Sequence, residues 1–145
     1  MMMSAKRGKY FNSIDGWGPI LKTPGISFVN LQYGDSAPEI ARAKEKFDMT
    51  IHQMDGLDLK QDIDGTAALA ATLDLVLSAP TAAAHTAASV GAPVWFLSAG
   101  KGWPQLDTDT YPWHPNTRVF WPEKFADWGE VMPRFVAEVA NFAAG

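Results

Sequence analysis

Short apolar runs alternate along the chain with segments of helical periodicity, and this alternation predicts an α/β protein. The apolar runs have the length of buried strands and are separated by turn residues. They are Ile26–Leu31, Met49–His52, Leu75–Ser78, Val94–Leu97 and Arg118–Trp121. Each run is therefore expected to form one strand of a sheet.

The segments between these runs have the apolar spacing of helices that cover a sheet on one side. The predicted helices are a short one around Trp17–Leu21, a second over Pro38–Phe47, a third capped by Asp64 that runs to Leu73, an alanine-rich one from Thr81 to Gly91, and a last one that begins at Asp127. Asp127 and Glu130 have the spacing of a capping box. Pro133 is expected to kink the last helix or to mark its first turn.

Strands that alternate with helices favour a doubly wound, Rossmann-like sheet that is mainly parallel and flanked by helices. Such sheets bind ligands at the carboxyl ends of their strands. This rule places Gln32–Asp35, Ser78–Thr81 and Ser98–Trp103 around one crevice. Residues 73–97 form a strand, a tight turn and a helix, and the free N–H groups at such a helix start attract phosphate. The segment therefore predicts a nucleotide site.

Composition indicates an ordinary globular chain of 145 residues, with 47% hydrophobic and 19% charged residues. One domain is expected over residues 14–145, preceded by a flexible basic segment over residues 1–13. The net charge of −4 argues against a nucleic-acid-binding protein. Lys6, Arg7, Lys9 and Lys22 are too few for a patch that follows a phosphate backbone.

The chain contains no cysteine, which excludes disulfides, thiolate metal sites and a cysteine nucleophile. This composition fits a cytoplasmic protein. No apolar run is long enough to span a membrane, and the first residues lack the apolar core of a signal peptide. Asp62 and Asp64 form a carboxylate pair without further well-placed ligands, so no metal and no cofactor are expected. No nucleophile elbow, dinucleotide fingerprint or Walker loop occurs, and catalytic residues stay unknown.

Three segments together resemble the C-terminal half of a GT-B glycosyltransferase. They are PGISFVNLQYGD (Pro24–Asp35), the run Asp62–Leu97, and YPWHPNTRVFW (Tyr111–Trp121). The chain is most similar to the tetratricopeptide-linked glycosyltransferase-like proteins, which are related to the heptosyltransferase and O-GlcNAc transferase groups. The resemblance covers nearly all of residues 14–140 and implies a domain that binds a nucleotide-diphosphate sugar, the donor.

The resemblance also implies roles for particular residues. Thr81, Ala82 and His85 match a family segment of the form D-T-A-x-x-H-L-A, which implies that Thr81 and Ala82 lie against the donor pyrophosphate. Gln32 and Gly34 match the family's L-Q-x-G-D turn. Taken by themselves, the residues leave alternatives open. His85 orients a phosphate or packs between helix and sheet, and Ser78 contacts the donor or caps the helix. In the same way, Trp113 and His114 stack on a ligand or pack the loop.

The chain departs from the family pattern at several places. Pro80 replaces an aspartate, Thr86 replaces a leucine, and Trp103 is followed by Pro104-Gln105 instead of arginine. A family strand of the type G-[IL]-S-W-R, which lies in the middle of the sheet, and the acceptor-binding domain both precede the matched region and are absent here. The chain thus resembles a fragment, and donor binding is expected to be weak or lost.

Two functions follow as expectations. The first is a donor-binding domain that is not catalytic on its own, because the base catalyst of such enzymes comes from the other domain. The second is a remnant or assembly domain that has lost donor binding. Because unpaired strand edges tend to pair with another chain, a homodimer or higher oligomer is expected.

Overall fold

The computed structural model describes residues 11–145. The predicted flexible basic segment falls mostly on residues 1–10, which lie outside the described residues. In chain order the elements are α2 (Gly18–Leu21), β1 (Phe28–Val29), α3 (Ala37–Phe47), β2 (Ile51–His52), α4 (Ile63–Ala71), β3 (Val76–Ser78), α5 (Ala82–Ser89), β4 (Val94–Leu97), η1 (Trp103–Gln105), β5 (Thr117–Phe120) and α6 (Trp128–Ala143). The chain is therefore an α/β protein, as its hydrophobic pattern predicts.

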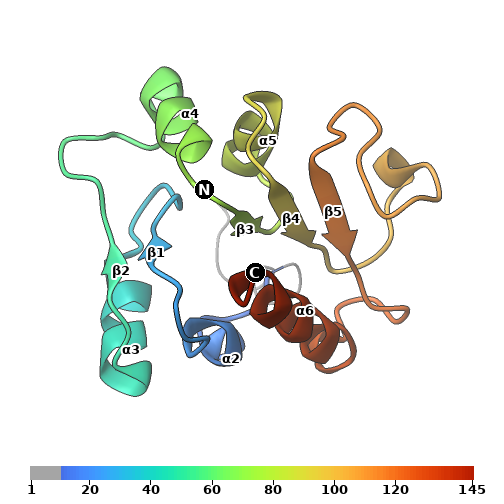
Figure 1. The fold of residues 1–145 in the computed structure, drawn as a ribbon, viewed down its shortest axis with the longest axis horizontal. Helices are drawn as coiled ribbons and strands as arrows, with labels where there is room; N and C mark the ends of the chain where they lie inside the picture. The colour runs from blue at the N-terminus through green and yellow to red at the C-terminus, as the bar shows by residue number, and fades with distance from the viewer. Residues whose placement is uncertain (1–10) are drawn as a thin grey trace.

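Within residues 11–145 all strand pairs are parallel, and they form two sheets in the order β1-β2 and β3-β4-β5. In the view of Figure 1 the strands follow one another from left to right in the order β2, β1, β3, β4 and β5, and the β1-β2 pair stands apart from the larger sheet. In the larger sheet, Phe96 of β4 is in register with Ser78 of β3 and with Val119 of β5. All four residues of β4 are buried, as expected for a parallel strand that is covered on both faces.

Helices cover both faces of the sheets and divide the core into two clusters (Figure 1). The alanine-rich helices α4 and α5 cover one face, where Ala84, Ala87 and Phe96 are buried. On the other face α6 and α2 pack together, and Ile20, Phe120 and Phe135 are buried there. Alanine on α4 and α5 lets those helices approach closely, while α6 contributes the large side chains. The predicted Rossmann-like α/β arrangement of helices around parallel strands is confirmed.

The predicted first two strands are shorter than their apolar runs. Of Ile26–Leu31 only Phe28–Val29 is paired, because β2 offers only Ile51–His52 as a partner. β2 starts late since the backbone N–H of Met49 still donates to the carbonyl of Ala43 at the end of α3, at 3.4 Å. The prediction that Met49 belongs to the strand was therefore wrong.

Two predicted helix caps also need correction. The cap of α4 is Asp62, whose carboxylate accepts from the Gly65 N–H at 2.7 Å, whereas the predicted cap, Asp64, lies in the first turn. The capping box of α6 is only half formed, although Asp127 does accept from the Glu130 N–H at 3.2 Å. The Glu130 carboxylate instead accepts from the Glu123 N–H at 2.9 Å and so fixes the loop before the helix. Pro133 lies inside α6 rather than in its first turn.

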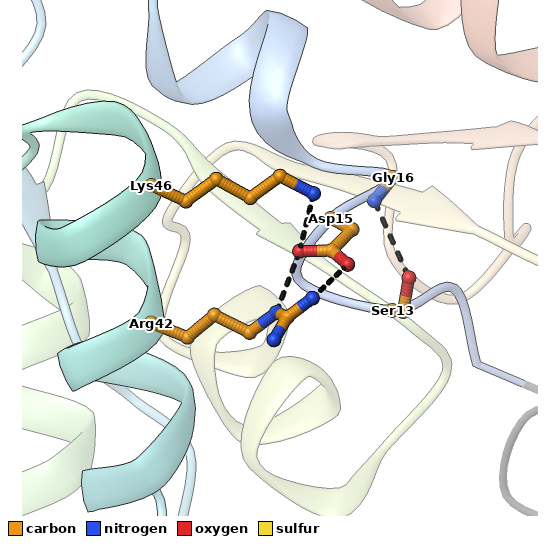
Figure 2. A network of polar contacts seen from close by, with 5 residues as sticks. All are labelled: Ser13, Asp15, Gly16, Arg42 and Lys46. Carbon is orange, nitrogen blue, oxygen red and sulfur yellow. Dashed lines mark hydrogen bonds and ion pairs between the residues drawn. The ribbon is translucent and has the colours of Figure 1, made fainter.

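A small ion network attaches the N-terminal turn to α3 (Figure 2). The carboxylate of Asp15 accepts from Nε and Nη2 of Arg42 at 2.8 and 2.6 Å, and Nζ of Lys46 lies 3.3 Å away. Ser13 accepts from the Gly16 N–H and closes the turn that carries Asp15. Hydrogen bonds from Arg42, with Lys46 nearby, lower the pKa of Asp15 to about 2.

In the described part of the chain, no helix is both long and apolar enough to cross a lipid bilayer.

Replacing Asp15 by Asn removes the bidentate contact to Arg42 and is expected to lower the thermal unfolding midpoint at pH 7 by a few degrees. Because the folded pKa is depressed, this stabilisation is present above the unfolded pKa of about 4. It is lost as the pH falls toward about 2. Differential scanning fluorimetry between pH 7 and pH 2 should show the two midpoints converging.

The matched control is Asp48→Asn, since the Asp48 carboxylate pairs with Lys44 only within the end of α3, at 2.7 Å. This variant should lose less stability than Asp15→Asn because an exposed pair one helical turn apart contributes little. Equal losses for both variants, or a difference for Asp15→Asn that persists at pH 2, would contradict the assigned role of Asp15.

Candidate functional site

The candidate site is the turn that connects β3 to α5. β3 ends at Ser78, Ala79-Pro80 turns the chain, and Thr81 is the residue that caps α5. Thr81 has an extended backbone, and its Oγ1 accepts from the Ala84 N–H at 3.4 Å. Small side chains after Thr81 leave the backbone at the helix start open to approach from solvent.

Two backbone donors at this helix start have no partner among residues 11–145. The N–H groups of Ala82 and Ala83 belong to the first turn, so no earlier helical carbonyl can accept from them. Ala82 is exposed and Thr81 is half-buried. The sequence therefore creates a small cradle of free N–H groups at the positive end of α5, which is favourable for an anion.

Ser78 lies beside this cradle but does not cap the helix, since Thr81 does. Its hydroxyl donates to the carbonyl of Ala79 at 2.8 Å and lies 3.4 Å from Oγ1 of Thr81. The two hydroxyls thus fix the turn between strand and helix. Pro80 is exposed and offers no N–H, so the turn has one backbone donor fewer than it would have with another residue there.

Gln32 and Gly34 lie in the turn after β1, at the carboxyl end of the smaller sheet. The Asn30 side chain builds this turn by accepting from the Gln32 N–H at 3.0 Å and donating to Ser36 Oγ at 3.1 Å. Gly34 has a φ of +91°, a left-handed conformation that suits glycine. The Gln32 amide is held by the Glu39 carboxylate at 2.8 Å, so a ligand would have to compete for it.

The loop after β4 is the third predicted border of the crevice. Ser98 closes its first turn by donating to the carbonyl of Gly100 at 2.8 Å. Lys101, the cation nearest to this edge in the sequence, pairs with Asp107 at 2.7 Å. Trp103 is 81% exposed, so its indole ring is available to a ligand or to another protein surface. Among residues 11–145, no hydrogen bond joins these three turns to one another.

His85, one turn into α5, lies in a cluster of aromatic rings. Its imidazole is 5.0 Å from the ring of Phe96 on β4 and 5.2 Å from that of Tyr111. The second histidine of the cluster, His114, has its ring centre 5.6 Å from His85. Trp113 stacks on Tyr111 at 5.8 Å and is half exposed, so it is the outer layer of the cluster.

Burial, with a smaller effect from His114, lowers the pKa of His85. Burial likewise raises the pKa of the Tyr111 hydroxyl. The His85 ring is therefore uncharged at neutral pH and packs as an aromatic ring in this state. A negative ligand at the start of α5 would favour its protonation.

Sequence reasoning did not place Tyr111 and His114 beside His85. No local pattern could reveal it, because both residues come from a loop more than 25 positions later in the sequence. Within residues 11–145 no group of three or more potential metal ligands occurs. A hollow of about 230 Å³ lies between Trp121, Glu123 and Arg134, but none of the six predicted site residues lines it.

Comparison with known proteins adds one relative. No family model matches the chain, and no solved structure matches it. Protein FlbA of Caulobacter vibrioides is 42% identical over 144 residues, which cover 99% of this chain and 24% of FlbA. The chain thus spans about a quarter of the length of the curated relative that it matches.

The lowered pKa of His85 predicts a pH dependence of stability. The folded protein binds the His85 proton less readily than the unfolded chain does, so the stability is full above the unfolded pKa of about 6.5. It decreases as the pH falls below that value. His85→Phe keeps an aromatic ring next to Phe96 and should flatten this decrease between pH 6.5 and pH 5 in thermal unfolding experiments.

His52→Gln is the matched control, because His52 is an exposed histidine at the end of β2. It should leave the pH profile as in the unchanged protein. A profile that is equally steep with and without the His85 imidazole would show that this ring does not cause the acid sensitivity.

Proposed function

We propose that this chain is a nucleotide-diphosphate-sugar-binding domain related to the donor domains of GT-B glycosyltransferases, and that it is not catalytic on its own. The observation that carries the proposal is the N–H cradle formed by Ala82 and Ala83 at the start of α5. Its position at the carboxyl end of a parallel strand supports this use, because ligands of doubly wound sheets bind there.

In this proposal the pyrophosphate lies against the start of α5. Two free N–H groups and the helix dipole stabilise its charge, and the same groups stabilise the charge that develops on a leaving nucleoside diphosphate. The Thr81 hydroxyl holds the helix start in place through Ala84. The protein's net charge of −4 does not itself attract a dianion, so recognition rests on these local donors.

In this proposal the imidazole of His85 also responds to the bound phosphate, because nearby negative charge favours its protonation. Its ring packs against Phe96 and Tyr111 in the free protein. The half-exposed Trp113 on the far side of Tyr111 is a surface on which a base or a sugar could stack.

A remnant that has lost donor binding is the second candidate function. Pro80 favours it, because the turn before α5 lacks one backbone donor at the position where the resembled family has an aspartate. The Gln32 amide is also already held by Glu39. In this case the fold serves assembly within a longer protein.

Ala82→Pro separates the two candidates. Thr81 has φ −126° and ψ 162°, which is compatible with a following proline, and the first helical position tolerates proline. The variant therefore removes one donor of the cradle and keeps the helix. If the chain binds a sugar nucleotide, ligand-observed NMR with UDP, GDP, ADP and CMP species should show binding that weakens at least about tenfold in Ala82→Pro.

Ile63→Pro is the matched control, since Ile63 is the exposed first residue of α4. It should leave any nucleotide binding unchanged. Binding that both variants retain in full would place the ligand away from α5, and silence of the unchanged protein across the panel would favour the remnant.

We also propose that the isolated chain associates through its exposed strand edges into a homodimer or higher oligomer. The motivation is that β1 and β3 each pair on one edge only among residues 11–145. Size-exclusion chromatography with light scattering at micromolar concentration should give at least twice the 15.8 kDa mass of the chain. A monomer at these concentrations would contradict this proposal.

A further inference from the structure

A hollow of about 230 Å³ lies between the loop that follows β5 and the first two turns of α6, the helix to which that loop leads in Figure 1. Trp121 and Glu123 line it from the loop, and Glu130, Val131 and Arg134 line it from the helix. The hollow is smaller than the roughly 300–1,000 Å³ of pockets that hold drug-sized ligands, so it suits a molecule of about the size of an amino acid.

The loop side of the hollow is fixed by backbone hydrogen bonds. The Glu130 carboxylate accepts from the N–H groups of Glu123 at 2.9 Å and of Lys124 at 3.4 Å. Ala126 has a φ of +61°, which is uncommon for a residue other than glycine, and its N–H donates to the carbonyl of Ala99 at 2.7 Å. Such a conformation persists only where the surrounding structure determines it, so the hollow is built into the fold.

Arg134 supplies the positive charge of the hollow. Its Nη2 donates to the carbonyl of Trp121 at 3.3 Å, and its guanidinium carbon lies 5.6 Å from the centre of the Phe120 ring. Within residues 11–145 no carboxylate forms an ion pair with it. A guanidinium carries five N–H donors and binds a carboxylate through two of them in parallel. Arg134 therefore has donors left for the carboxylate of a ligand.

Two carboxylates supply the negative charge. The Glu123 side chain is exposed and has no ion-pair partner in the described part of the chain. The Glu130 carboxylate accepts from two backbone donors and keeps further lone pairs for a cation, since an ionised carboxylate offers about four. Nζ of Lys101 lies 6.0 Å from the centre of the Trp121 ring, but Asp107 balances its charge at 2.7 Å. The residues that line the hollow thus have a net charge of −1.

The remaining lining of the hollow is apolar. Val131 is 2% exposed and belongs to the core cluster under α6, and the Trp121 ring is half-buried. An aliphatic stem that lies on these two side chains is shielded from water, while the charged ends of the same molecule stay at the rim.

An extended peptide that adds a strand to β5 does not suit this place. At the outer edge of β5 the Val119 N–H already donates to the carbonyl of Asp109 at 2.7 Å, and the carbonyl of Trp121 accepts from Arg134. Strand addition needs such backbone groups to be free. A small molecule with its own charged groups is the better occupant.

We infer that the hollow binds a free amino acid with a basic side chain, such as lysine, ornithine or arginine. Its α-carboxylate pairs with Arg134, its two cationic groups pair with Glu123 and Glu130, and its aliphatic stem lies on Val131 and Trp121. A neutral amino acid would leave one of the two carboxylates without a cation. A diamine would leave the guanidinium without an anion.

NMR titration of the isotope-labelled full chain with L-lysine tests this inference. The indole N–H of Trp121 and the backbone amides of Glu123 and Val131 should shift in a saturable way. L-Norleucine lacks the side-chain ammonium of lysine, and cadaverine lacks its carboxylate, while both keep the aliphatic stem. Each should bind at least about threefold more weakly than L-lysine, because each loses one exposed ion pair.

Variants then assign the ion pairs. Glu123→Gln should remove the preference for L-lysine over L-norleucine, and Arg134→Leu should remove the preference for L-lysine over cadaverine. Glu123→Gln leaves the fold intact, because its exposed side chain has no partner within residues 11–145. Glu45→Gln is the matched control, since Glu45 is an exposed glutamate on α3 that does not line the hollow. It should keep both preferences.

Four results would overturn the inference. They are an absence of shifts at Trp121, Glu123 and Val131, equal affinity for L-lysine, L-norleucine and cadaverine, equal effects of Glu45→Gln and Glu123→Gln, and equal affinity for Nα-acetyl-L-lysine. The last compound mimics the final residue of a peptide and would identify a chain terminus instead of a free amino acid. The titrations contain no nucleotide, so their outcome is independent of the proposed function.

Discussion

The pairing of β4 on both of its edges is the constraint on which the larger sheet depends. Its four residues are buried, and their pairing fixes the registers of β3 and β5 together. The start of α5 is placed by β3, and the loop that carries Tyr111 and His114 is placed by β5. β4 therefore positions both the N–H cradle at the start of α5 and the aromatic cluster around His85, although their residues come from distant parts of the sequence.

Local patterns predicted the element types well, because strands and helices here follow their apolar spacing closely. Val94–Leu97 was predicted to the residue, and the boundaries of β3 and α5 differ by one or two positions. Failures occurred where a longer-range contact decides the boundary. Met49 stays with α3 because of its bond to Ala43, and Asp62 rather than Asp64 reaches the Gly65 N–H. Both boundaries are decided by which atoms come within hydrogen-bond distance in the folded chain, and the spacing of apolar residues does not specify that.

The candidate site could be predicted only in part. The sequence predicts Thr81 and Ala82 at a helix start, because a threonine that can cap a helix and a run of alanines follow a buried strand. The surroundings of His85 could not be predicted, since Phe96, Tyr111 and His114 meet it through tertiary packing. Ring packing and the proposed response to phosphate are compatible for this residue, because burial lowers the pKa of His85 and a nearby negative charge would raise it.

The covered edge of β5 has a consequence for how copies of this chain can associate. Open-ended growth of strand upon strand needs two free edges on every molecule, one to accept and one to offer. On that edge the Val119 N–H donates to the carbonyl of Asp109 and Arg134 donates to the carbonyl of Trp121, so growth cannot continue from the β5 side. β2, β1 and β3 each pair on one edge only among residues 11–145, so strand-to-strand association of copies has to use those edges.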